Sequence, residues 1–185
     1  VLCTDKTGTL TENRMTVTSL VDEAGRWIPG AVGPAMESAG TIMQAALGAC
    51  PQAPTDPMDM AIHDLARKRF PEVAERFAGQ RIVHSYGLRP DLFAVANILG
   101  EADSAGNVAF AKGAVEAIAE LCGLSAERLG HIRSLADAQA HDGIRVLGVA
   151  RTQVFRQPFP ESLRALHFEL VGLVAFADPV RGNVP

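Results

Sequence analysis

One carboxylate near the start of the chain stands among groups that suit phosphoryl transfer. Asp5 ends a short apolar stretch and is followed by Lys6, Thr7 and a glycine-containing turn. A carboxylate can attack a phosphorus atom, while an ammonium, hydroxyls and backbone N–H groups hold the phosphate oxygens. Mg²⁺ can bridge the carboxylate and the phosphate. The segment therefore predicts an aspartyl phosphate at Asp5.

This loop resembles the phosphorylation loop of P-type cation-transporting ATPases. The likeness covers Asp5–Thr11, and the flanking residues resemble the calcium and sodium/potassium-type branch. It implies that Asp5 and the Thr7 carbonyl bind Mg²⁺ and that Lys6 orients the loop. Thr7 stands where soluble phosphatases of the same superfamily carry a second carboxylate for general acid–base work. The difference favours a long-lived phosphoenzyme over a phosphatase.

The resemblance spans the whole chain and implies its domain organisation. Residues 1–12 would begin a haloacid-dehalogenase-like phosphorylation domain, 13–177 would form an inserted nucleotide-binding domain, and 178–185 would be the hinge that returns to the phosphorylation domain. The chain would then be a fragment at the cytoplasmic face of a membrane, which binds ATP without turnover. Its partners would be ATP and the remaining phosphorylation, actuator and transmembrane domains of a pump, which binds its transported cation elsewhere.

Four residues resemble nucleotide-contacting positions of the family. Asp59 would meet the adenine amino group, Lys112 would face phosphate or the edge of the ring, and Arg145 would reach the ribose and phosphates. Gly113 would let the backbone approach the ligand closely, because glycine has no side chain. At the hinge, Asp178 and Arg181 would face the closing cleft.

The chain departs from the family at Leu88, where relatives carry a phenylalanine that stacks on adenine. Aliphatic contact would replace stacking there, and adenine affinity would weaken. Tyr86, Phe93 or Phe110 could supply a ring instead, and the sequence does not choose among them. Two alternatives to the pump function remain: a soluble phosphatase of the haloacid-dehalogenase type, and a regulatory docking module with weakened nucleotide binding.

Composition narrows the class of protein. The 185 residues include 17 basic and 21 acidic side chains, so the net charge is −4 and a nucleic-acid partner is disfavoured. A membrane-spanning helix needs about 18 consecutive apolar residues, and no stretch approaches that length. Three widely spaced cysteines indicate neither a disulfide framework nor a zinc site.

Hydrophobic periodicity predicts the elements that must position these residues. A hairpin is expected from Met15 to Ile28, and Asp56 followed by Pro57 marks a helix start. Helices are expected at 38–47, 57–70, 114–122 and about 126–140, and strands at 81–86, 92–99, 108–111, 144–154 and 166–176. The connections between strands are too short for parallel crossovers. The expected fold class is α+β, a mainly antiparallel sheet flanked by helices, with short terminal segments of the phosphorylation domain.

Overall fold

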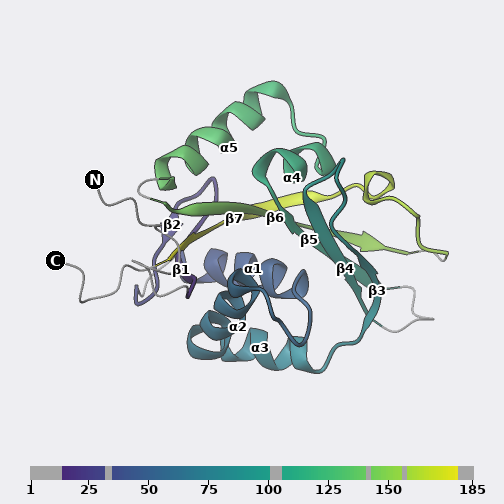
Figure 1. Ribbon diagram of the computed structural model, residues 1–185, viewed down its shortest axis with the longest axis horizontal. Coiled ribbons are helices and arrows are strands. Elements are labelled where there is room, and N and C mark those ends of the chain that lie inside the picture. The colour runs from purple at the N-terminus through teal and green to yellow at the C-terminus, as the bar shows by residue number, and fades with distance from the viewer. Residues whose placement is uncertain (1–13, 32–34, 101–105, 141–142, 156–157, 179–185) are drawn as a thin grey trace, which may run out of the picture.

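A twisted antiparallel sheet forms the centre of the molecule (Figure 1). The computed structural model describes residues 14–31, 35–100, 106–140, 143–155 and 158–178. Among these residues the seven strands follow the spatial order β2-β1-β7-β6-β5-β4-β3, and every pairing is antiparallel. The strands are β1 (Thr16–Val21), β2 (Arg26–Trp27), β3 (Ile82–Tyr86), β4 (Ala94–Leu99), β5 (Asn107–Gly113), β6 (Arg145–Val154) and β7 (Glu169–Ala177).

Helices cover both faces of the sheet (Figure 1), and the sheet separates one hydrophobic core on one face from two smaller ones on the other. One face carries α1 (Ala35–Gly48), α2 (Pro57–Arg69) and α3 (Pro71–Ala78); the other carries α4 (Val115–Leu121) and α5 (Ala126–Gln139). A short 3₁₀ helix, η1 (Leu163–Ala165), precedes β7. Because side chains alternate along a strand, Phe110 enters the core under α1 whereas its neighbours Ala109 and Ala111 enter the core under α4.

The expected α+β architecture is confirmed in outline, with local differences. The hairpin forms with Leu20 opposite Trp27, and the Asp56 side chain accepts hydrogen bonds from the backbone N–H groups of Met58 and Asp59. The sequence analysis did not predict α3, which begins directly after Phe70. Pro71 occupies its first turn, where the missing N–H of proline costs no hydrogen bond.

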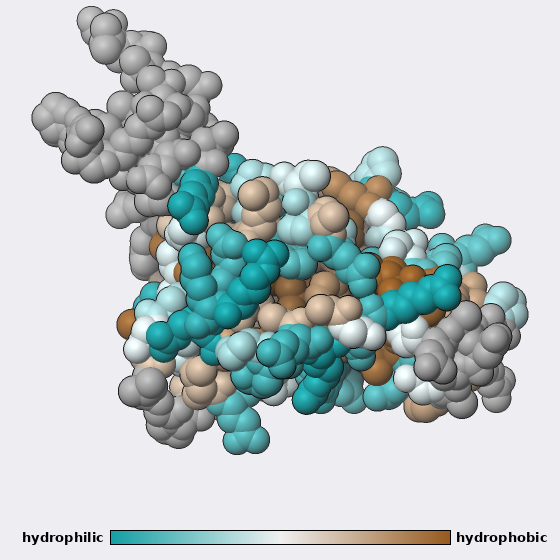
Figure 2. All heavy atoms as spheres, turned by 90° about the horizontal axis from the view of Figure 1, so that it is seen from below, coloured by the Kyte–Doolittle hydropathy of each residue, from teal (hydrophilic) through white to brown (hydrophobic). Residues whose placement is uncertain are grey.

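The face formed by the first three helices is mainly hydrophilic. Figure 2 shows it with hydrophobic residues in small, separated patches between polar side chains. A chain of this size normally exposes scattered apolar atoms, so these patches by themselves indicate no partner. The candidates for binding or catalysis on this side of the molecule are therefore its buried polar side chains.

The tight approach of α1 to the sheet predicts opposite effects for two glycines in that helix. A Cβ atom at Gly48 would lie 2.5 Å from a ring carbon of buried Phe110, whereas at Gly40 the nearest atom would be 3.9 Å away. Gly48→Ala should lower the free energy of unfolding by about 1–3 kcal/mol through overpacking. Gly40→Ala, the matched control, should raise it by about 0.5–1 kcal/mol through helix propensity. Urea unfolding measures both, and a stabilised Gly48→Ala would contradict the packing.

Candidate functional site

Asp59 and Lys112, 53 residues apart in sequence, meet in a buried ion pair. Asp59 lies in the first turn of α2, and Lys112 is the penultimate residue of β5. The Lys112 ammonium donates to Asp59 Oδ1, and the two side chains are only 7% and 13% exposed. The Asp56 cap and Pro57 determine where α2 begins, and so where the Asp59 carboxylate lies. The structure thus brings together two of the residues that the sequence predicted.

Cys50 is a third member of this cluster, and sequence reasoning missed it. Lys112 Nζ donates to Cys50 Sγ at 3.3 Å, and Sγ lies 3.6 Å from Asp59 Oδ1 and donates to the Ala46 carbonyl at 3.2 Å. Burial raises the pKa of the Cys50 thiol, and the charge of Lys112 offsets this only in part. The thiol is therefore neutral at physiological pH. A single cysteine before a proline has no spacing pattern that could have revealed this contact.

Asn97 holds the segment that carries Cys50 against the sheet. Its side-chain amide donates to the Gly48 carbonyl at 3.3 Å and to the Cys50 carbonyl at 2.9 Å, and its Oδ1 accepts from Ser85 at 2.8 Å. The carbonyls at the end of a helix have no partner within the helix, so Asn97 satisfies two groups that would otherwise be buried unbonded. This second polar residue was also not predicted, because its partners lie 47 and 49 residues away.

Gly113 lies where β4 and β5 approach each other most closely at this end of the sheet. A Cβ atom there would lie 2.2 Å from the Phe93 carbonyl oxygen and 2.6 Å from Ala94 Cα. The same Phe93 oxygen accepts a hydrogen bond from Ala114 N at 2.9 Å. Strand packing therefore requires glycine at this position, whether or not a ligand also approaches it.

The strand register places Arg145 on the same side of the sheet as Lys112. Lys112 lies opposite Val149 in β6, and Arg145 precedes Val149 by four residues, so both side chains leave the same face. Arg145 is exposed and lies opposite Phe176 in β7. Asp178 follows β7 at the same end of the sheet, where it accepts a hydrogen bond from Arg14 N at 3.3 Å.

Among the three candidate rings, Phe93 is the exposed one. Tyr86 is buried and its hydroxyl donates to the Pro160 carbonyl at 2.7 Å, and Phe110 is buried against α1. The Phe93 side chain is 61% exposed, next to the end of β5. Leu88, at 65%, is exposed in the same connection between β3 and β4. The remaining predicted site residues, Asp5, Lys6, Thr7 and Arg181, lie outside the described residues.

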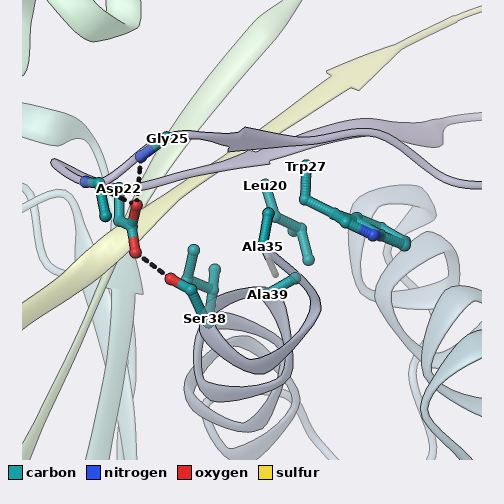
Figure 3. Close-up of a pocket in the computed structure, with 9 residues that line it drawn as sticks. Leu20, Asp22, Gly25, Trp27, Ala35, Ser38 and Ala39 are labelled. Atoms are coloured by element: carbon teal, nitrogen blue, oxygen red, sulfur yellow. Dashed lines mark hydrogen bonds between the residues drawn. The ribbon is translucent and has the colours of Figure 1, made fainter. Parts of the chain in front are cut away.

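Two of the cavities among the described residues have linings that include no member of this cluster. The first, of about 260 Å³, separates the β1–β2 hairpin from α1 (Figure 3). Asp22 at its edge already accepts from the backbone of Ala24 and Gly25, at 2.9 Å each, and from the Ser38 hydroxyl. Leu20, Trp27, Ala35 and Ala39 supply the apolar wall in the same view. Asp22 therefore joins the hairpin to α1, and the cavity offers a ligand few polar partners.

The second cavity, of about 470 Å³, lies among α1, α2 and α3 and is lined in part by His63 and Phe77. His63 Nε2 lies 3.0 Å from the Pro51 carbonyl, so this nitrogen carries the proton and donates. Burial lowers the pKa of His63, and the imidazole packs edge-on against the Phe77 ring. Among the described residues no group of three or more histidine, cysteine or acidic side chains is placed to hold a metal ion.

Comparison with known proteins gives a partial likeness. No protein-family model matches the chain. Over all 185 residues it is 26% identical to a Methanocaldococcus jannaschii protein named "Putative cation-transporting ATPase", and it spans about 20% of that protein's length. This distant similarity supports a relationship to cation-transporting ATPases and does not distinguish a branch. No helix among the described residues is long and apolar enough to cross a membrane.

The buried ion pair predicts a strong energetic coupling. Removing one partner leaves the other charge buried and unpaired, so Lys112→Met and Asp59→Asn should each lower the free energy of unfolding, the former by about 3 kcal/mol. The double variant should lose less than the sum of the two, by at least about 1 kcal/mol. Arg133→Met is the matched control, because its pair with Glu116 is half exposed and should contribute less than about 1 kcal/mol. Additive losses in urea unfolding would contradict the pairing.

His63 predicts a loss of stability in mild acid. Because its pKa is lowered in the folded chain, the unfolded chain binds more protons once the pH falls below about 6.5. Between pH of about 7.5 and about 5.5 the wild-type chain should lose stability, and His63→Gln should lose less. Exposed His131→Gln is the control and should behave as the wild type. Equal pH dependence in all three chains would show that His63 is not the group responsible.

Proposed function

We propose that this chain is the ATP-binding portion of a P-type cation-transporting ATPase. The observation that carries the proposal is the buried Asp59–Lys112 pair at the end of the sheet where Phe93 is exposed and where Arg145 leaves the same face as Lys112. A carboxylate, an aromatic ring and two cations are the groups that recognise an adenine nucleotide. The similarity to a cation-transporting ATPase supports the same proposal.

The base would be held by Asp59 and Phe93. The Asp59 carboxylate can only accept hydrogen bonds, so it suits the exocyclic amino group of adenine and repels the carbonyl that guanine carries there. The Phe93 ring, 61% exposed, offers a face for stacking, and Leu88 adds apolar contact from the same connection. ATP should therefore bind more tightly than GTP.

Lys112 would face a phosphate or the edge of the ring, and Arg145 would hold the phosphates. An ammonium has three N–H donors, so Lys112 can keep its contacts with Asp59 and Cys50 and still donate to an oxygen of the ligand. Because Lys112 is buried, water screens its charge less than it would at the surface. The exposed Arg145 guanidinium can bind phosphate through two parallel hydrogen bonds.

Transfer of the γ-phosphate would then take place at Asp5. Its carboxylate would attack the γ-phosphorus while the bond from that phosphorus to the β–γ bridging oxygen breaks, so that the aspartyl phosphate forms and ADP leaves, with Lys6 orienting the loop. Mg²⁺, held by Asp5 and the Thr7 carbonyl, would supply charge neutralisation. Asp178 and Arg181 would lie at the hinge that brings the nucleotide to Asp5. In the intact pump the resulting phosphoenzyme would drive cation transport, at the cytoplasmic face of the membrane.

Phe93 gives the sharpest test of the nucleotide site. Titration of the 185-residue chain with ATP by calorimetry should give a dissociation constant in the micromolar to millimolar range, about −8 to −4 kcal/mol. Phe93→Ala should weaken binding roughly 5- to 150-fold, the loss of about 1–3 kcal/mol of stacking. Phe155→Ala is the matched control, because that ring is 67% exposed and follows the opposite end of β6. It should bind ATP as the wild type does.

The two alternative functions predict different results for the same 185-residue chain. No binding at millimolar ATP would overturn the nucleotide site and favour a regulatory docking module. Hydrolysis of a phosphomonoester, or steady release of phosphate from ATP, would favour a soluble phosphatase. A chemical-shift titration that moves Asp59, Lys112 and Arg145 with ATP more than with GTP would support the proposed arrangement.

A further inference from the structure

A tight turn directly precedes the exposed ring of Phe93. Residues Arg89–Leu92 read Arg-Pro-Asp-Leu, with proline and aspartate at the central positions that such turns favour. The turn closes with a hydrogen bond from Leu92 N to the Arg89 carbonyl at 3.2 Å, and Ala94 N donates to the Leu92 carbonyl at 2.8 Å. Leu92 and Ala94 are both buried in the core under α4, so Phe93 between them points away from that core.

Arg164 binds this turn from a distant part of the chain. Its Nη1 donates to Asp91 Oδ2 at 2.7 Å, and its Nη2 donates to the Asp91 backbone carbonyl at 2.8 Å. Its Nε donates to Glu120 of α4 at 2.6 Å. One guanidinium thus joins η1, α4 and the turn, although Asp91 is 73 residues away in sequence.

The parts of this connection are themselves held in place. Leu163, the neighbour of Arg164, is buried in the same core as Leu92, and the Ser162 hydroxyl accepts from Arg164 N at 3.3 Å. The hydrogen bonds from Arg164, and next those from Arg89, hold the pKa of Asp91 below its ordinary value. The carboxylate is therefore charged at neutral pH, and the connection is complete under the conditions in which a nucleotide would bind.

Arg164 lies on the wrong side of the sheet to touch a ligand at Lys112. Its partner Glu120 belongs to α4, whereas Lys112 and Asp59 lie on the face covered by α1 and α2 (Figure 1). Exposed ion pairs add little to global stability, but a planar guanidinium bonded to both a carboxylate and a backbone carbonyl restricts the local conformation. Its effect is therefore expected at Phe93, two residues after Asp91.

We propose that Arg164 is a positioning residue for base recognition: it holds the Arg89–Leu92 turn so that the Phe93 ring is presented at the end of β5. The inference rests on the proposed nucleotide site and adds to it a residue that acts through Phe93 without touching the ligand. No motif of the sequence points to Arg164.

The test compares Arg164→Ala with Arg128→Ala. Arg128 makes an equally exposed two-bond pair with Glu23, at 2.9 and 3.3 Å, remote from the turn. Without nucleotide, Arg164→Ala should speed amide exchange at Leu92 and its neighbours and around Glu120, where Arg164 also bonds, while amides elsewhere and the melting temperature stay unchanged. It should also weaken ATP binding roughly two- to thirty-fold. Arg128→Ala should do neither, and Arg164→Lys, which lacks the fork of donors, should restore binding only in part.

A double variant shows whether the effect passes through Phe93. If it does, adding Arg164→Ala to Phe93→Ala should cause no further loss of ATP affinity. Additive losses, or unchanged exchange at the turn, would overturn the inference. Unchanged binding by Arg164→Ala together with weakened binding by Phe93→Ala would overturn this inference alone. Absence of ATP binding by the wild-type chain would overturn it together with the proposed function.

Discussion

The buried contact between Lys112 and Asp59 constrains how the first three helices sit on the sheet. An ion pair removed from water is tolerated only when its geometry is good, because the loss of hydration must be offset by mutual attraction and further hydrogen bonds. The start of α2 must therefore lie at the end of β5 and nowhere else. The Asp56 cap sets where that helix begins, and Asn97 holds the segment before it. The cap and the Asn97 hydrogen bonds together place Asp59 in contact with Lys112.

The contact also places a charged side chain inside the core. Replacing a buried ion pair by apolar residues is often neutral or stabilising, so stability alone does not require Lys112. In the proposed function the buried ammonium of Lys112 would contact the nucleotide. The Cys50 thiol, which contacts both partners of the ion pair, is neutral and adds no second charge.

The two faces of the sheet have different roles. The face under α1 and α2 carries the polar cluster, and the face under α4 carries the apolar anchor Leu92 and the exposed bonds of Arg164. The short connection between β3 and β4 contacts both faces of the sheet. Leu92 is buried on one side, while the next side chain, Phe93, points away from it. Arg164 and the buried Leu92 thus hold the turn without covering the Phe93 ring.

The local structure and the chemical character of the chain could be predicted from its residues. Hydrophobic periodicity predicted the hairpin, four of the five helices and the antiparallel sheet, and Asp56 with Pro57 predicted the start of α2, because caps and periodic apolar faces act within a few residues. The fold brings Cys50 and Asn97 into the cluster, leaves Phe93 as the exposed ring among the three candidates and places Arg164 against the turn before it. Those contacts join segments tens of residues apart, so they depend on strand order and register, which local patterns do not encode.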